Sequence, residues 1–478
     1  MPVTRREFLA GAAAAALARA QSEQPQFVAK ADSIVYIWLP GGIAQTDTWD
    51  PKKFTQYTPG MKGSELLGTC PSIPTAADGV RLGQGLENIA AVMDRGAILR
   101  TLTSETKFGA VHLKAQHYAN TGYLFPAGVK APSIGAIVGR SLGRRDPNVP
   151  SYIYIGRDVD TSDEEKLFIS EYIGPGFYGV NHAPFMIPEP AKGLATLNAV
   201  AGMQLDRLDR RQRYLEAITG ELPAANKASD YMKVMADARA MMDSPVKRAF
   251  DYRKEEQPEL IRAYEPEIAE SELLDPQYYY GNRFGHGLLL ARRLVERGAR
   301  FIQVEYQYGP FKGFDMHEDG QRRMVEMKRQ IDRPIGTFIR DLDQRGLLDR
   351  TLVVIATEFG RTIASAPAAG KEPDGFAERN TGEKLAIENQ KMYGFHGHFS
   401  TCTNMLFFGA GIRRGYVHGK TAERHPMEPV EHPVTLIDAY ATIFKALGLR
   451  ADTSYVTEGR PFYVTNNGKG RPVEALLA

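Results

Sequence analysis

The chain has 478 residues, 24% of them charged, and a formal net charge of +2. A charge this close to zero gives no argument for binding nucleic acid or an anionic membrane surface. The length exceeds that of one compact core, which predicts one large domain with insertions, or two lobes. We assign residues 28–470 to a single α/β domain, and the sequence names no protein partner.

The first predicted element is an export signal at residues 1–20. Arg5 and Arg6 precede a short alanine-rich apolar run, and residues 18–20 form an A-x-A cleavage pattern, as in a twin-arginine (Tat) signal. The apolar run is shorter than the about 20 residues that cross a bilayer, and no long apolar run follows. We therefore expect a periplasmic or secreted protein without a stable membrane span. The alternatives are an ordinary N-terminal helix or an uncleaved anchor.

Removal of residues 1–20 takes away three arginines and one glutamate, which lowers the formal charge from +2 to zero. Apolar runs of strand length then follow at residues 33–39, 97–102, 152–155, 300–306, 351–356 and 404–409. Their lack of polar alternation suits strands covered on both faces, as in a parallel sheet. Helical periodicity lies between them, at residues 111–122, 284–298, 324–346 and 434–448. The alternation predicts an α/β fold with a mostly parallel central sheet and helices on both faces.

Two segments depart from this alternation. Residues 195–280 are charged, helical in period and poor in strand signals, which predicts a helical insertion that covers part of the sheet. Residues 367–395 are rich in glycine, proline, lysine and glutamate, which predicts a mobile loop. That loop joins two candidate site motifs, so a lid over the site and a tolerated surface loop are equally good interpretations.

Short polar motifs follow several of the predicted strands and define the candidate site. In open α/β sheets, ligands bind outside the carboxyl ends of the strands. Asp315 and His317 follow the fourth run, and Glu358 follows the fifth, with Arg361 three residues later. Carboxylates and imidazoles suit a divalent metal, and the guanidinium of Arg361 suits an anionic group. The alternatives are a surface pair on a loop and a plain salt bridge between Arg361 and Glu358.

More candidates flank the same predicted edge. His396 and His398 precede the sixth run, and we weight His398 above His396 as a zinc ligand. Asp47 and Asp50 follow the first run, where Asp47 suits a metal and Asp50, before a proline, equally suits a turn.

The predicted helix over residues 111–122 carries His112 near its N-terminus and His117 further along. A helix N-terminus favours anions, so a phosphate or sulfate group would rest there. The alternative for both histidines is an ordinary helix surface.

Several kinds of active site are excluded. The sequence has no phosphate-binding P-loop, no G-x-S-x-G elbow and no H-E-x-x-H zinc motif. Its two cysteines, Cys70 and Cys402, are too few for a thiolate zinc site, and a disulfide between them stays open.

Taken together, these motifs resemble the alkaline-phosphatase and sulfatase superfamily and, within it, the Tat-exported bacterial family catalogued as domain-of-unknown-function 1501. The matching segments, which span nearly the whole mature chain, are Gly41-Gly42, Asp47, residues 50–52, 290–296, 314–317 and 358–362, His398 and residues 409–411. The resemblance implies an alkaline-phosphatase-like sheet, one or two divalent ions, and hydrolysis of phosphate or sulfate esters. Zinc is the first choice, with calcium or manganese as alternatives. By position, the implied metal ligands are Asp47, Asp315, His317, Glu358 and His398.

The chain also departs from the superfamily pattern. His112 stands where sulfatases carry a modifiable cysteine or serine, which argues against the formylglycine mechanism. Phe359 replaces the histidine of alkaline phosphatases, and Gly397 replaces their aspartate, so the pattern favours one well-formed metal site, with His396 as a compensating candidate. His112 is then a nucleophile or acid–base group, or it binds metal.

Two functions are compatible with these observations. The first is an exported metal-dependent hydrolase of small anionic esters, with His112 and Arg361 in catalytic roles. The second is a non-catalytic metal- or ligand-binding protein that keeps the scaffold, since fold alone does not fix function.

Overall fold

The computed structural model describes residues 27–103, 111–125, 130–156, 170–198, 205–219, 228–274, 276, 282–306, 313–363, 386–394, 396–457 and 460–478. The predicted export signal at residues 1–20 and residues 367–385 of the predicted loop lie outside these ranges. Within them, no helix has both the length and the apolar character needed to cross a membrane.

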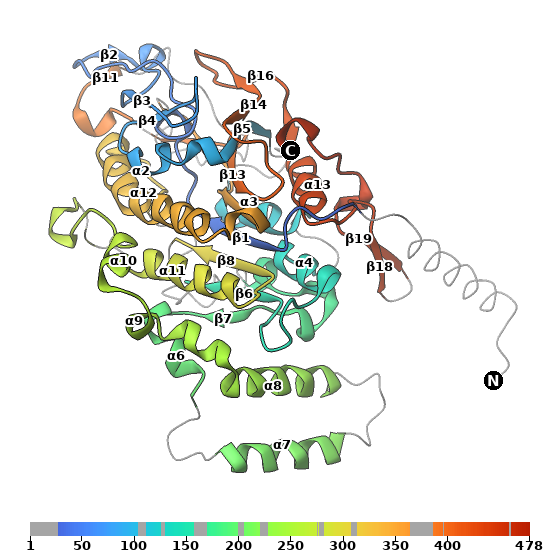
Figure 1. Ribbon diagram of the computed structural model, residues 1–478. Coiled ribbons are helices and arrows are strands. Elements are labelled where there is room, and N and C mark those ends of the chain that lie inside the picture. Colours follow the sequence, from blue (N-terminus) through green and yellow to red (C-terminus); the bar gives the residue numbers. More distant parts are fainter. Residues whose placement is uncertain are drawn as a thin grey trace, which may run out of the picture.

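A nine-stranded sheet forms the centre of the molecule (Figure 1). Its strand order is β14-β5-β13-β9-β1-β8-β6-β7, and β17 also pairs with β5. The strands are β1 (Ser33–Trp38), β5 (Gly96–Thr103), β6 (Tyr152–Ile155), β7 (Phe185–Ile187), β8 (Phe301–Glu305), β9 (Thr351–Ala356), β13 (Thr403–Gly409), β14 (Tyr416–His418) and β17 (Val434–Thr435). The prediction of a mostly parallel α/β sheet is confirmed, because every pairing is parallel except those of β13 with β5 and β9.

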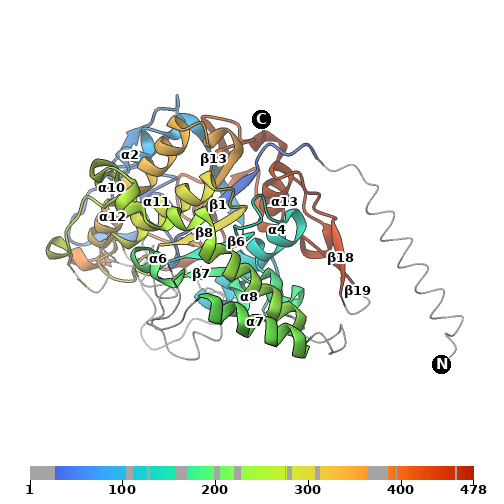
Figure 2. The same ribbon diagram turned by 60° about the horizontal axis from the view of Figure 1, so that its bottom comes forward.

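Alternate residues of β1 enter two separate cores, as the pleat requires. Val35 and Ile37 pack in a core with the helices α11 and α12, while Tyr36 and Trp38 face α4 and α13 on the other side. Helices therefore cover both faces of the sheet, as Figure 2 also shows. The helices are α2 (Glu87–Ala90), α3 (His112–Thr121), α4 (Ile134–Leu142), α6 (Gly193–Thr196), α7 (Leu205–Thr219), α8 (Ala228–Asp243), α9 (Tyr252–Glu255), α10 (Pro258–Ala263), α11 (Arg283–Glu296), α12 (Gly320–Gln344) and α13 (Leu436–Ala446).

Local sequence explains several helix ends. Ser133 begins α4 by accepting a hydrogen bond from the backbone N–H of Ala136, and Thr435 does the same for Asp438 at the start of α13. Gly122 ends α3 in the left-handed conformation. The helix α12 continues through Pro334, so the proline does not end it.

Helices dominate the region of the predicted insertion. In this region α7 packs against α8, which lies between α7 and β7, at the end of the molecule away from α2 and α12 (Figure 1).

Five small antiparallel strand pairs lie outside the central sheet. They are β2 (Met61–Lys62) with β11 (Ala386–Ile387), β3 (Ser72–Pro74) with β4 (Arg81–Gly83), β10 (Gly360–Arg361) with β12 (His398–Phe399), β15 (Lys420–Thr421) with β16 (Pro429–Glu431), and β18 (Ser454–Thr457) with β19 (Arg460–Tyr463). In the β10–β12 pair, Arg361 lies directly opposite His398.

Candidate metal centre

The parallel strands deliver polar residues to one edge of the sheet. Since β1, β8 and β9 run in the same direction, the segments that follow them leave the sheet at the same edge. Gly41 follows β1, Asp315 follows β8, and Glu358 follows β9. The first and third segments meet, because the backbone N–H of Gly41 donates to Oε1 of Glu358 over 2.8 Å, and Arg361 joins Gly41 to Asp315.

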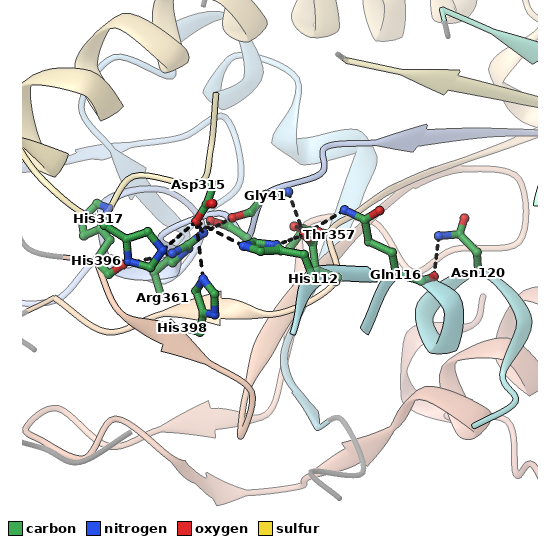
Figure 3. Close-up of polar contacts among 12 residues, drawn as sticks. Gly41, His112, Gln116, Asn120, Asp315, His317, Thr357, Arg361, His396 and His398 are labelled. Atoms are coloured by element: carbon green, nitrogen blue, oxygen red, sulfur yellow. Dashed lines mark hydrogen bonds and ion pairs between the residues drawn. The ribbon is translucent and has the colours of Figure 1, made fainter. Parts of the chain in front are cut away.

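Two histidines reach this edge by other routes. The strand β13 runs opposite to β9, so the residues that precede it, including His398, lie beside the end of β9. His112 is the first residue of α3, the helix that comes after β5. The close-up in Figure 3 shows both imidazoles directed at Asp315.

Asp315 is the centre of the cluster. Its Oδ1 atom lies 3.1 Å from Nε2 of His112, 3.0 Å from Nε2 of His317 and 3.4 Å from Nε2 of His398 (Figure 3). The Arg361 Nη2 atom lies 2.5 Å from the same oxygen. Three imidazoles and a guanidinium thus surround one carboxylate oxygen.

Glu358 contacts His112 from the other side of the imidazole ring. Oε1 of Glu358 lies 2.7 Å from Nδ1 of His112, and it also accepts a hydrogen bond from Nε2 of Gln116 over 3.2 Å. Oε2 accepts from the hydroxyl of Thr357 over 3.1 Å. With Nδ1 held by Glu358, the ring nitrogen of His112 that faces Asp315 is Nε2. A carboxylate that orients a ligating histidine in this way is a common feature of metal sites.

Arg361 is fully buried and holds several backbone carbonyl groups together. Its guanidinium donates to the carbonyl oxygens of Gly41, Gly42 and His396 and to the carboxylate of Asp315. Its own backbone is held by the side chain of Gln45. Arg361 therefore fixes the loop after β1 and the carboxylate of Asp315. Its role as a clamp on a substrate anion stays a prediction.

The cluster perturbs the protonation of its members. Burial opposes ionisation of Asp315, but hydrogen bonds from the three histidines outweigh it and hold the pKa of the carboxyl well below its usual range. Burial also opposes ionisation of Glu358, yet His112 lowers the pKa of Glu358. Burial disfavours the charged form of His112, but Asp315 and Glu358 raise its pKa overall. For His398, burial dominates and lowers the pKa to about 4.

The donor set fits a divalent metal. The ligand atoms of His112, Asp315 and His398 all lie within 4.8 Å of one another, and no other group of three or more histidine, cysteine or acidic side chains does so in the described part of the chain. Two imidazole nitrogens and one carboxylate oxygen are typical of a catalytic zinc site, in which a fourth position stays open. The His317 side chain is 45% exposed and adds a further nitrogen on the solvent side.

Asp47 and His396 form a separate pair. Oδ2 of Asp47 lies 3.5 Å from Nε2 of His396, and both side chains are completely or almost completely buried. Asp47 also accepts hydrogen bonds from the backbone N–H and the hydroxyl of Thr69. Among its described contacts none is with Asp315, so the structure places Asp47 outside the three-ligand group.

Asp50 and His117 also lie outside that group. Asp50 is buried between Lys52 and Arg100, at 3.2 Å and 3.3 Å. Nδ1 of His117 lies 3.0 Å from the carbonyl oxygen of Tyr123, and burial lowers its pKa. Both residues have local partners and face no member of the cluster in the described contacts.

Sequence reasoning missed the residues that support Glu358. Gln116 lies one helical turn after His112, so the i, i+4 spacing was the available signal for its position. The hydroxyl of Tyr172 donates to Oε1 of Gln116 over 2.6 Å, which directs the amide nitrogen at Glu358. No sequence signal pointed to Tyr172. The cysteines Cys70 and Cys402 are both free and buried.

Solved structures with a related arrangement include three whose names indicate enzymes. A phosphonate monoester hydrolase from Silicibacter pomeroyi is 11% identical, with a TM-score of 0.38, and the match covers 93% of this chain and 76% of that chain. The PsFucS1 sulfatase from Pseudoalteromonas sp. is 13% identical, with a TM-score of 0.35 and coverage of 98% and 78%. The lipoteichoic acid synthase LtaP from Listeria monocytogenes is 8% identical, with a TM-score of 0.35 and coverage of 93% and 76%. Because these TM-scores are low, the fold assignment rests on the strand pairing of the structure itself.

No protein of curated function matches the sequence. The sequence model of the family described as protein of unknown function DUF1501 matches residues 31–477, and the chain therefore belongs to that family.

Proposed function

We propose that the protein is a metal-dependent hydrolase of small anionic esters, of the phosphate or sulfate type, with zinc as the first choice of metal. The observation that carries the proposal is the convergence of His112, Asp315 and His398 within 4.8 Å. Three protein ligands and an open position are what a hydrolytic metal site needs. The ester class comes from the resemblance of the motifs to the alkaline-phosphatase and sulfatase superfamily.

Each side chain of the proposed centre has its own role. His112, Asp315 and His398 hold the ion, and Glu358 holds the imidazole of His112. A bound divalent ion polarises an ester oxygen or lowers the pKa of bound water towards about 7. His317, the most exposed member of the cluster, is the side chain placed to accept a proton on the solvent side. His112, whose two ring nitrogens both face carboxylates, acts in this proposal as a ligand rather than as a nucleophile.

The charge of the centre suits an anionic substrate. The carboxylates of Asp315 and Glu358 carry two negative charges, and Arg361, which contacts Asp315, carries one positive charge. A divalent ion then leaves the centre with a net positive charge, and opposite charge attracts a phosphate or sulfate ester.

We also propose that the protein acts in the periplasm or outside the cell. The support is the pair Arg5 and Arg6 with the short apolar run and the A-x-A pattern at residues 18–20. The Tat route exports folded proteins, which suits a protein that binds its metal before export.

A second candidate is a non-catalytic metal-binding protein on the same scaffold. It is favoured by His112, which occupies the start of α3 in place of a hydroxyl or thiol nucleophile. It is also favoured by Arg361, whose buried guanidinium donates to three carbonyl oxygens and to Asp315.

Ester turnover distinguishes the two candidates. Chelator-treated protein is reloaded with zinc, manganese or calcium and tested on aryl phosphate monoesters, aryl phosphate diesters and aryl sulfates by release of the phenol. His398→Ala removes one ligand, and His418→Ala is the matched control, because His418 is buried beside Tyr416 and away from the cluster.

The hydrolase proposal expects metal-dependent release of the phenol by the wild type and the control, and loss of release in His398→Ala. Bound metal without turnover on any ester supports the non-catalytic candidate. Folded wild-type protein that binds no metal refutes both.

A further inference from the structure

The Asp47 carboxylate is a buried charge outside the proposed metal centre. It is 0% exposed, and its pKa is below the usual range, because His396 and Lys328 outweigh the effect of burial, which alone would raise it. Oδ1 accepts from the backbone N–H of Thr69 over 3.0 Å, and Oδ2 accepts from its hydroxyl over 2.7 Å. A buried carboxylate of this kind requires a compensating cation.

Lys328 supplies a cation at this place. It lies on α12, is 1% exposed, and donates from Nζ to the carbonyl oxygen of Asp47 over 3.3 Å and to that of Gln84 over 2.5 Å. Its third described contact is Sγ of Cys70, at 3.5 Å. Two carbonyl oxygens and the Cys70 sulfur hold this ammonium group inside the protein, close enough to the Asp47 carboxylate for its charge to lower the pKa of that group.

The surroundings of Asp47 offer too few donors for an ion of its own. Among the described contacts, His396 is the one acidic or imidazole side chain within ion-pair distance of Asp47, and no set of three such ligands forms there in the described part of the chain. Phe359 packs against the rings of His112 and His398, with centroids 4.8 Å away from each. Phe359 therefore packs against two members of the proposed metal centre, and its carbon ring offers no ligand atom for a second ion.

We infer that the ammonium group of Lys328 takes the place of a second metal ion beside Asp47, so that the centre is mononuclear. A second divalent ion beside this fixed ammonium would meet strong repulsion at low dielectric. The inference rests on the proposed metal centre at His112, Asp315 and His398, and it fixes the composition of that centre.

Metal stoichiometry tests the inference directly. Chelator-treated protein is titrated with zinc, and the bound metal is counted by elemental analysis after removal of free ions. We expect about one zinc per chain in the wild type and in Asp47→Asn, and none in His398→Ala. Asp50→Asn is the matched control, because Asp50 is also a buried, lysine-paired carboxylate three residues away.

The outcomes separate the inference from the proposed function. Two zinc ions in the wild type, falling to one in Asp47→Asn but not in Asp50→Asn, would overturn the mononuclear centre and leave the hydrolase proposal intact. Unchanged zinc content in His398→Ala would instead remove the proposed metal centre.

A measurement on metal-free protein tests the role of Lys328 independently. If Lys328 is a counter-ion of Asp47, Lys328→Met leaves the buried carboxylate with only His396 and Thr69 as partners and lowers the melting temperature. Adding Asp47→Asn to that variant should then restore part of the loss, since the buried negative charge is gone. Strictly additive losses in the double variant, measured in the presence of chelator, would show that the two side chains are not coupled and would overturn the inference.

Discussion

Nδ1 of His112 lies 2.7 Å from Oε1 of Glu358, and this contact decides which ring nitrogen of His112 faces Asp315. Glu358 is itself held by Gly41 and Gln116, so it is a fixed reference for the imidazole. The geometry makes Glu358 an orienting partner of a ligand rather than a member of the three-ligand group.

Glu358→Gln should weaken zinc binding by about 10- to 100-fold, because the amide keeps the shape of the side chain but loses the charge that orients His112. A competition titration with a chromophoric chelator measures the affinity. Asp332→Asn is the control, since Asp332 is a buried carboxylate that accepts from Asn88 and Ile89 elsewhere. Wild-type affinity in Glu358→Gln would contradict the orienting role.

Zinc affinity should fall as the pH falls, and His112 should be responsible. Burial alone would lower the pKa of His112, but Asp315 and Glu358 raise it, so the imidazole holds a proton that zinc must displace. Below that pKa, release of one proton predicts a loss of about tenfold in affinity per pH unit. His398, with a pKa lowered to about 4 by burial, needs no proton removed near neutral pH.

The same titration at a series of pH values checks this sign. In Glu358→Gln, loss of one carboxylate should move the onset of the decline to lower pH. Affinity that stays constant from about pH 5 to pH 8 would mean that no imidazole proton is displaced.

Gly42→Ala should damage the site, because Gly42 has a φ of +80° and an added Cβ would lie 2.7 Å from the ring of Phe359 and 2.9 Å from Nε of Arg361. Gly60→Ala is a closely matched control, since Gly60 has the same φ and nothing within 4 Å. Both variants should lose about 1–2 kcal/mol from the left-handed backbone. Gly42→Ala alone should lose roughly 1–3 kcal/mol more, from the steric clash. Equal losses of the free energy of unfolding in the two variants, measured by chemical denaturation, would show that the loop after β1 accommodates the added methyl group without a clash.

Arg361→Met should lower the free energy of unfolding by about 3–5 kcal/mol, because it removes the partner of a partly buried carboxylate and three hydrogen bonds to carbonyl oxygens. Arg350→Met is the comparison, since the ion pair of Arg350 with Asp32 is exposed and should cost at most about 1 kcal/mol. Urea denaturation of both metal-free variants gives the two values. Similar losses of the free energy of unfolding in the two variants would mean that Arg361 stabilises the protein no more than an exposed ion pair does.

Replacement of Arg5 and Arg6 by lysine should abolish export, because the Tat route reads the arginine pair itself. Fractionation of cells that express the wild type and the variant shows the location. The variant should accumulate in the cytoplasm, whereas equal amounts of both proteins outside the cytoplasm would argue for another route.

The bounds of several strands could be predicted from the sequence alone. The fifth apolar run, residues 351–356, coincides with β9, and the run at residues 152–155 coincides with β6. Buried strands and amphipathic helices leave a local hydrophobic pattern, which is why such segments are predictable. The reversed direction of β13 left no local signal, because pairing direction depends on the chain between strands.

Only the tertiary structure decided which polar residues work together. The sequence determined that carboxylates and imidazoles collect near strand ends, with Asp315, His317, Glu358 and His398 among them. The sequence could not show that Asp47 lies outside the metal centre. Asp47 is held there by contacts with Thr69 and Lys328, and neither residue belongs to a recognisable motif. Nor could the sequence show that Glu358 faces Nδ1 of His112, 246 residues away. Residue types and strand ends are local properties of a sequence, whereas the partner of a buried charge is fixed only when distant segments pack together.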